Sequence, residues 1–330
     1  MQKVTSMSGV ARTVAGGALL MVLAMLGGHA AAADYPTRTV SIVVPFVAGS
    51  ATDVFARILA DGLRNELNAS FIVEAKPGGG MAIGAGYVAR AENDGHTLLL
   101  APAASVTLNE IINPALPYRG ADFAPIALLA VVPQVLTVRG VLPVRTVQEF
   151  GAYAKARPGE VTLGNGGVNT LTQIMAKILE QDLGVTFNHI PFNGSTAARA
   201  AMLANQIDAA MDVISGLPDF EREGKLYPLG VLAHRRHPAL PNTKTFVELG
   251  FKRMDREGWF GLMAPKGTSP AIVAQLDKAV RRALTDPTVV QRITAMGLQD
   301  RYSSTAEFVN VLNQDSKAWQ AYVAENPIAK

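Results

Sequence analysis

Short apolar runs alternate with longer amphipathic segments along most of the chain. Residues 39–44 are rich in β-branched side chains and end before a proline, which is typical of a strand. Residues 53–67 carry apolar side chains at helical spacing with polar ones between them, which predicts an amphipathic helix. The same alternation predicts strands at 71–74, 97–100, 135–138, 161–163, 187–190 and 208–214, and helices at 83–91, 147–156, 172–183 and 197–204.

Strands and helices that alternate in this way predict an α/β fold, in which parallel sheets are covered by helices on both faces. Ligands of such sheets bind in crevices at the carboxyl ends of the strands. The last third of the chain departs from this rhythm. One strand is expected at 258–265, and two amphipathic helices, 272–284 and 306–325, close the chain.

The first 33 residues have the three parts of a secretory signal peptide. Lys3 and Arg12 form a basic start, an apolar run follows at 14–26, and Ala31 and Ala33 make an A-x-A end. A membrane span needs roughly 20 apolar residues, and this run is shorter. We therefore expect residues 1–33 to be removed, with Asp34 as the new N-terminus and a periplasmic destination.

Charge and cysteine content exclude several classes of function. The chain has 30 Lys and Arg and 27 Asp and Glu, and loss of Lys3 and Arg12 leaves 28 basic residues. This near balance gives no reason to expect nucleic acid or an anionic membrane as a partner. The absence of cysteine excludes disulfides and thiolate metal sites. About 297 mature residues favour two domains, and we expect a monomer without cofactor or metal.

Two loops that contain glycine join a predicted strand to a predicted helix. The first loop is 45–53 and the second loop is 164–170. A helix begins with about four N–H groups without backbone partners and a partial positive charge. Small residues let an anion approach these N–H groups, so such loops can hold a carboxylate without Lys or Arg. Neither loop contains a basic residue.

Motifs that are modest one by one follow in a specific order along nearly the whole mature chain. They are VPFVAGSATDVFAR (44–57), VEAKPGGG (73–80), NDGHTL (93–98), GNGG (164–167), HIPFNG (189–194), NQID (205–208), HPALP (237–241), FVELG (246–250) and WFGLMAP (259–265). In this order and spacing, the sequence resembles the solute receptors of tripartite tricarboxylate transporters, often called Bug receptors.

The resemblance implies an α/β fold of the periplasmic binding protein type II kind. Two lobes, each with a mainly parallel sheet flanked by helices, would enclose a cleft. We place one lobe at 34–134 plus 256–330 and the other at 135–255, with crossings near Pro133 and Gly258. The implied function is capture of a small carboxylate (a dicarboxylate, an amino dicarboxylate or an aromatic acid) in the periplasm. The carboxylate would pass to the membrane subunits of such a transporter, or be sensed.

The resemblance also implies the residues at the site. The first loop would hold one ligand carboxylate through backbone N–H groups and water, and the second loop would reach it from the other lobe. The implied residues are Phe46, Ala48, Ser50, Thr52 and Asp53, then Asn165, Gly166, Gly167, Asn169 and Thr170, with Pro102, Ala103, Ala104 and Phe192 beside the cleft. For Asp53 two roles stay open: capping of the helix, or contact with an amino or hydroxyl group of the ligand.

Departures from the family pattern concern the ligand more than the class of protein. Ser50 stands where the family usually has a second glycine, and Asn165 replaces a serine. Asn193 stands where Lys or Arg is common, which makes a highly charged ligand less favoured.

A secreted α/β hydrolase, or another enzyme on a two-lobed fold, is the alternative interpretation. The G-x-S-x-G motif is absent, because Thr52 stands where its second glycine would be. Asp208 and Asp212 are better interpreted as residues of a buried strand than as a catalytic pair. His234 and His237 are expected on a solvated surface turn. We therefore expect binding without catalysis.

Overall fold

The structure, a computed structural model, describes residues 35–325. Of these, the residues from Arg38 to Glu325 belong to one compact unit, distinct from the segment before it. The expected signal peptide and its cleavage site lie outside the described residues. None of the helices within residues 35–325 combines the length and the apolar composition that a membrane span needs.

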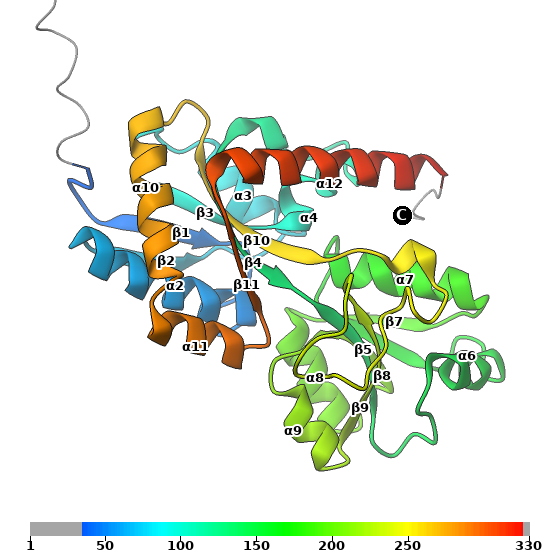
Figure 1. The fold of residues 1–330 in the computed structure, drawn as a ribbon. Coiled ribbons are helices and arrows are strands. Elements are labelled where there is room, and N and C mark those ends of the chain that lie inside the picture. The colour runs from blue at the N-terminus through cyan, green and yellow to red at the C-terminus, as the bar shows by residue number, and fades with distance from the viewer. Residues whose placement is uncertain (1–34, 326–330) are drawn as a thin grey trace, which may run out of the picture. The chain divides into compact units, whose positions relative to one another are not determined.

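The first sheet has six strands in the order β11-β4-β10-β3-β1-β2 (Figure 1). The strands are β1 (Val40–Val44), β2 (Phe71–Ala75), β3 (Thr97–Pro102), β4 (Phe123–Val132), β10 (Gly258–Pro265) and β11 (Gln299–Ser303). Helices α2 (Ala51–Leu67), α10 (Pro270–Ala283) and α11 (Pro287–Ala295) pack together on one face of the sheet. The other face is covered by α3 (Ala82–Ala89), α4 (Ala103–Val106), α5 (Asn109–Ile112) and α12 (Thr305–Glu325).

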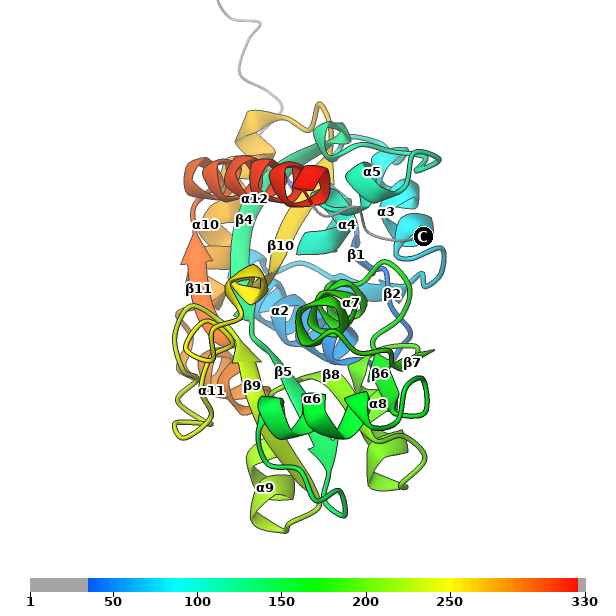
Figure 2. The same ribbon diagram turned by 90° about the vertical axis from the view of Figure 1, so that its right-hand side faces the viewer.

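The second sheet has five strands in the order β7-β6-β8-β5-β9 (Figure 2). The strands are β5 (Gln134–Arg139), β6 (Thr162–Asn165), β7 (Asn188–Pro191), β8 (Ala209–Val213) and β9 (Leu226–Leu232). Helices α6 (Val147–Lys155) and α7 (Leu171–Leu183) share a buried core on one face. Helices α8 (Ser195–Leu203) and α9 (Leu217–Arg222) share a separate core on the other.

The expected α/β class is confirmed, but both sheets are mixed rather than mainly parallel. In the first sheet β1 pairs in parallel with β2 and β3, whereas β10 is antiparallel to β3 and β4. In the second sheet β6 is parallel to β7 and β8, whereas β5 is antiparallel to β8 and β9. A parallel pair needs a crossover, usually a helix. Four of the five antiparallel pairs involve β5 or β10.

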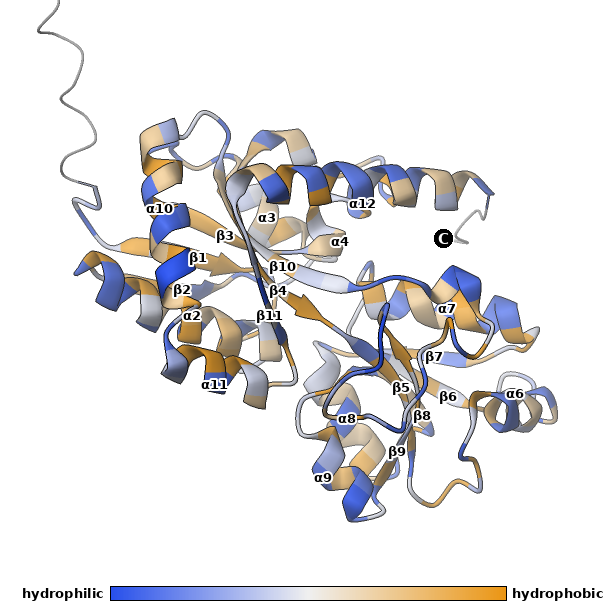
Figure 3. Cartoon of the chain, in the orientation of Figure 1, coloured by the Kyte–Doolittle hydropathy of each residue, from blue (hydrophilic) through white to orange (hydrophobic). Residues whose placement is uncertain are grey.

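Two chain segments connect the sheets side by side. Strand β4 continues into β5 through Pro133, and β10 returns antiparallel to β4, with Gly258 opposite Val132 (Figure 1). Figure 3 shows that the strands of the first sheet are mostly apolar, whereas the helices carry polar residues toward solvent. The predicted strands and helices are present with ends shifted by a few residues. Strands β4, β9 and β11 and helices α4, α5, α9 and α11 are additions.

Candidate functional site

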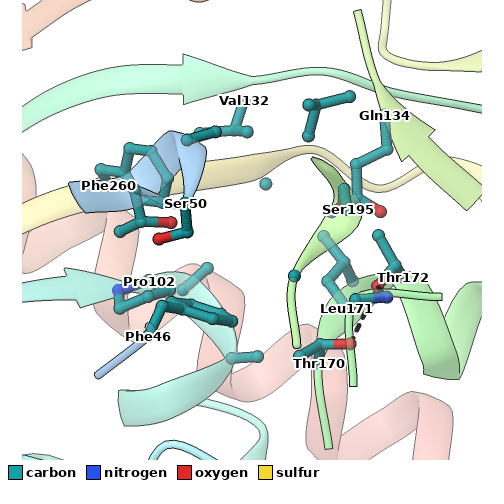
Figure 4. Close-up of a pocket in the computed structure, with 18 of the residues that line it drawn as sticks. Phe46, Ser50, Pro102, Val132, Gln134, Thr170, Leu171, Thr172, Ser195 and Phe260 are labelled. Carbon is teal, nitrogen blue, oxygen red and sulfur yellow. Dashed lines mark hydrogen bonds between the residues drawn. The ribbon is translucent and has the colours of Figure 1, made fainter. Parts of the chain in front are cut away.

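A cavity lies where the two sheets meet, beside the crossing segments (Figure 4). The space between its lining atoms, counted to its open mouth, is about 800 Å³. Its lining residues are Phe46, Ser50, Ala51, Thr52, Met81, Pro102, Ala103, Ala104, Val132, Gln134, Gly166, Thr170, Leu171, Thr172, Gly194, Ser195, Val213, Gly258, Trp259, Phe260, Met296 and Leu298. Among these described residues none has a charged side chain, and apolar atoms make up most of the exposed lining.

The first loop ends in a capped helix start. Ser50 is the N-cap of α2, and its Oγ accepts a hydrogen bond from the N–H of Asp53 at 3.3 Å. The N–H groups of Ala51 and Thr52 come before the first intrahelical bond, so they have no partner within the helix. Both residues line the cavity together with Ser50. This wall therefore offers backbone and hydroxyl donors to an anion.

Asp53 lines neither this cavity nor the smaller hollow beside it. Its Oδ2 accepts hydrogen bonds from the N–H of Gly49 and from the Nε of Arg57, both at 3.0 Å. Asp53 is 2% exposed, and Gly49 has a φ of 79° that glycine adopts without strain. The carboxylate of Asp53 thus holds the shape of the first loop.

The second loop uses most of its own hydrogen-bond donors internally. The N–H of Gly166 donates to the Thr172 Oγ1 at 2.9 Å, and the N–H of Gly167 donates to the Asn165 Oδ1 at 3.0 Å. The Thr170 hydroxyl donates to the carbonyl of Gly167 at 2.6 Å and lies 2.8 Å from the Thr172 hydroxyl. The free backbone donors of this region are therefore the first N–H groups of α7, and the buried Asn165 Nδ2 has no partner among the described residues.

The starts of three helices meet at one place in the cavity. A Cβ built on Gly166 would lie 3.1 Å from the Thr172 Oγ1 of α7 and 3.3 Å from the Ser195 Oγ of α8. A Cβ built on Gly194, which precedes α8, would lie 3.7 Å from the Cβ of Ser50, which precedes α2. The N–H of Gly194 also donates to the carbonyl of Gly166 at 3.2 Å. Three partial positive charges therefore point to a common region, which favours an anion there.

The opposite part of the lining comes from the crossing segments, the end of β8 and the residues before β11, and no local pattern in the sequence predicts it. Its members are Val132 and Gln134 on either side of Pro133, Val213 at the end of β8, Gly258, Trp259 and Phe260 of β10, and Met296 and Leu298 before β11. In Figure 4 Gln134 and Ser195 lie on one side of the cavity, across from Ser50 and Phe260. Gln134 is the single polar side chain of this described group.

The structure places the sequence-predicted site residues in three groups. Phe46, Ser50, Thr52, Pro102, Ala103, Ala104, Gly166 and Thr170 line the cavity. Gly167 and Phe192 line the smaller hollow, which shares Phe46, Met81, Gly166 and Thr170 with the cavity. Ala48, Asp53, Asn165 and Asn169 line neither. The other lining residues, Ser195, Gln134 and Met81 among them, were not predicted as site residues. The helix start after Gly194 was a usable signal for Ser195.

The carboxylates considered as a catalytic pair have separate structural partners. Asp212 is fully buried, and Arg199 donates to its two oxygens at 2.7 and 2.9 Å. Burial raises the pKa of Asp212, and the charge of Arg199 opposes this rise. Asp208 accepts hydrogen bonds from Arg139 at 2.7 Å and from the Thr162 hydroxyl at 2.9 Å.

The expectation of a solvated histidine turn holds for His234 and is wrong for His237. The His234 side chain is 58% exposed, whereas His237 is 5% exposed. The N–H of Ala239 donates to the His237 Nδ1 at 3.1 Å, which turns the ring inward, and burial lowers the pKa of His237. Within residues 35–325 no three His, Cys, Asp or Glu side chains are grouped as a metal site would require.

A family model described as the tripartite tricarboxylate transporter family receptor matches residues 55–327. The chain belongs to this family. The receptor is 29% identical to protein BugT of Bordetella pertussis over 309 residues, which are 93% of this chain and 95% of BugT. It is 31% identical to periplasmic binding protein BugD, with a TM-score of 0.80 over 88% of this chain and 98% of BugD.

A third similar protein has been solved with a ligand. MatC from Rhodopseudomonas palustris, with bound malate, is 30% identical, with a TM-score of 0.82 over 88% of this chain and 100% of MatC. These likenesses confirm the fold of a periplasmic binding protein and the resemblance found in the motifs. Members of this family are solute-binding receptors and not enzymes, so the hydrolase alternative is set aside.

Proposed function

We propose that this receptor binds a small carboxylate in the periplasm and delivers it to the membrane subunits of a tripartite tricarboxylate transporter. The observation that carries the proposal is the meeting of the α2, α7 and α8 starts at one place in a cavity whose described lining has no charged side chain. Such a place suits an anion held by N–H groups. MatC, which binds malate, shares the fold and the family.

In this proposal the carboxylate lies against the first loop and the starts of α7 and α8. The hydroxyls of Ser50 and Thr52 and the N–H groups of Ala51 and Thr52 donate to it, while Gly166 and Thr170 pack against it. Phe46, Ala103 and Ala104 shape the wall beside it. Asp53 and Asn165 act indirectly, because their side chains hold the two loops through Gly49 and Gly167.

We further propose that the two lobes close on the ligand. The lobes are 34–134 plus 256–330 and 135–255, and the hinge consists of the two crossings at Pro133 and Gly258. Export follows from the signal peptide at 1–33, and intact-mass measurement of exported protein should give an N-terminus within two residues of Asp34. Trp259 lines the cavity at the second crossing, so its fluorescence should change when the ligand binds.

Isothermal titration calorimetry with a panel of small carboxylates and their uncharged amides tests the proposal. We expect carboxylates to bind and amides not to bind. Ser50→Ala should weaken binding by about 1–3 kcal/mol, because it removes a hydrogen bond to a charged acceptor. Thr146→Ala is the matched control, since Thr146 caps α6 in the same way and lies outside the cavity lining. Equal affinities of Ser50→Ala and the unmodified receptor would contradict the proposed position of the carboxylate. If no carboxylate of the panel bound, the proposed function would be wrong.

A further inference from the structure

The cavity of this receptor has one polar end and one apolar end. At the polar end Gly166 and Gly194 bring the starts of α7, α8 and α2 together. The crossing segments form the apolar end with Val132, Trp259, Phe260 and three further apolar side chains. This asymmetry limits the charge that a ligand can carry.

The polar end provides one position for an anion rather than two. The three helix starts do not lie at opposite ends of the cavity, because Ser195 Oγ and Thr172 Oγ1 both lie within 3.3 Å of a single Cβ position on Gly166. Ser50 lies beside them, because a Cβ built on Gly194 would lie 3.7 Å from the Cβ of Ser50. Since the field of a helix start falls off within its first turn, these three starts act on the same carboxylate.

The apolar end offers no compensation for a second charge. Strands β4, β8 and β10 contribute four of its six apolar side chains, and the backbone groups of these strands are paired in the sheets. Met296 and Leu298 come from the segment between α11 and β11. A carboxylate moved there would lose its hydration without gaining a cation, which is strongly unfavourable. A hydrocarbon or aromatic group would instead gain from burial, at roughly 25 cal/mol per Å² of apolar surface.

Gln134 is the exception at the apolar end. It is 6% exposed, it lines the cavity, and its Oε1 is buried without a hydrogen-bond partner in the described chain. An amide group can present its oxygen or its nitrogen by turning over, and it carries no charge. Gln134 therefore suits an uncharged polar group, such as a hydroxyl, better than a carboxylate.

We propose that the ligand is a monocarboxylate with an apolar body, and that Gln134 binds an uncharged polar group on that body. This inference rests on the proposed function and narrows it. The single carboxylate lies at the starts of α2, α7 and α8, and the body extends toward Trp259 and Phe260. A dicarboxylate such as the malate of MatC would place its second charge among apolar side chains.

Matched ligands test the number of charges. Hexanoate, 6-hydroxyhexanoate and adipate share one carbon chain and end in a methyl, a hydroxymethyl and a carboxylate group. Benzoate and terephthalate form a second pair. By titration calorimetry at neutral pH, we expect each monocarboxylate to bind at least tenfold more tightly than its dicarboxylate, and 6-hydroxyhexanoate to bind more tightly than hexanoate.

The variant Gln134→Leu tests the residue itself. It should reduce the affinity ratio of 6-hydroxyhexanoate to hexanoate to about one. A ratio that stays as in the unmodified receptor removes the role of Gln134. Tighter binding of adipate or terephthalate than of the matched monocarboxylate overturns the inference and leaves the proposed function standing. If no carboxylate of any kind binds, the proposed function itself is wrong, and the inference that rests on it is wrong too. The comparison of ligands uses the unmodified receptor, so it does not depend on whether a variant folds.

Discussion

Replacement of Asp53 by alanine separates the two roles that the sequence left open for this residue. In the structure its carboxylate accepts from the N–H of Gly49 and from Arg57 and does not line the cavity. Asp53→Ala therefore removes the support of the first loop without removing a ligand contact. We expect a loss of both stability and carboxylate affinity.

The size of the stability loss follows from three contributions. A hydrogen bond to a charged acceptor is worth about 1.5–3 kcal/mol. The negative charge near the start of α2 adds about 0.3–1 kcal/mol. The pair with Arg57, whose side chain is 54% exposed, adds only about 0.2–1 kcal/mol. We expect a total of about 2–4 kcal/mol, since such contributions do not add fully.

Urea denaturation and calorimetry of three variants measure these quantities. Asp53→Ala should unfold at distinctly lower urea and bind carboxylate more weakly. Asp53→Asn keeps an oxygen acceptor for Gly49 and should lose less of both. Arg57→Ala removes only the exposed partner and should lose under about 1 kcal/mol. If Asp53→Ala bound carboxylate more tightly, Asp53 would face the ligand as a repelling charge, and the reasoning above would be refuted.

Three other variants test the cavity, the closure and the core. Gly166→Ala should weaken carboxylate binding tenfold or more in calorimetry, because its Cβ enters the place where three helix starts meet. Normal affinity would contradict this geometry. Gly80→Ala should weaken carboxylate binding more than its control Gly184→Ala. Both glycines have a positive φ, 61° and 62°, but only a Cβ on Gly80 would meet the second loop, at 3.0 Å. Equal affinities of the two variants would argue against closure of the lobes. Arg199→Met leaves Asp212 buried without its counter-charge and should cost about 3–5 kcal/mol in urea denaturation at neutral pH. Because burial raises the pKa of Asp212 above its unfolded value, this loss should shrink as pH falls toward about 4, and a loss that grows instead would contradict the assignment.

The sequence predicted most elements because their signals are local. The helix from Ala51 to Leu67 could be recognised from its apolar spacing and from the capping residue before it. The first loop could be recognised for the same reason, since Ser50 and Asp53 bond to groups within four residues of themselves. Strand β4 was missed because it is apolar almost throughout, and such a run shows neither helical nor alternating periodicity.

Only the tertiary structure decided what the second loop and the crossings do. The hydrogen bonds that the N–H groups of Gly166 and Gly167 make within the second loop could not be predicted from a glycine-rich motif, because the same motif is equally typical of a loop with open anion-binding N–H groups. The apolar end of the cavity joins Val132, Val213 and Leu298, residues far apart in the sequence. The chain by itself determined that anion-binding helix starts exist, because a helix start needs only neighbouring residues. That three of them meet at one place depends on how two sheets pack, and this packing sets the charge that the ligand can carry.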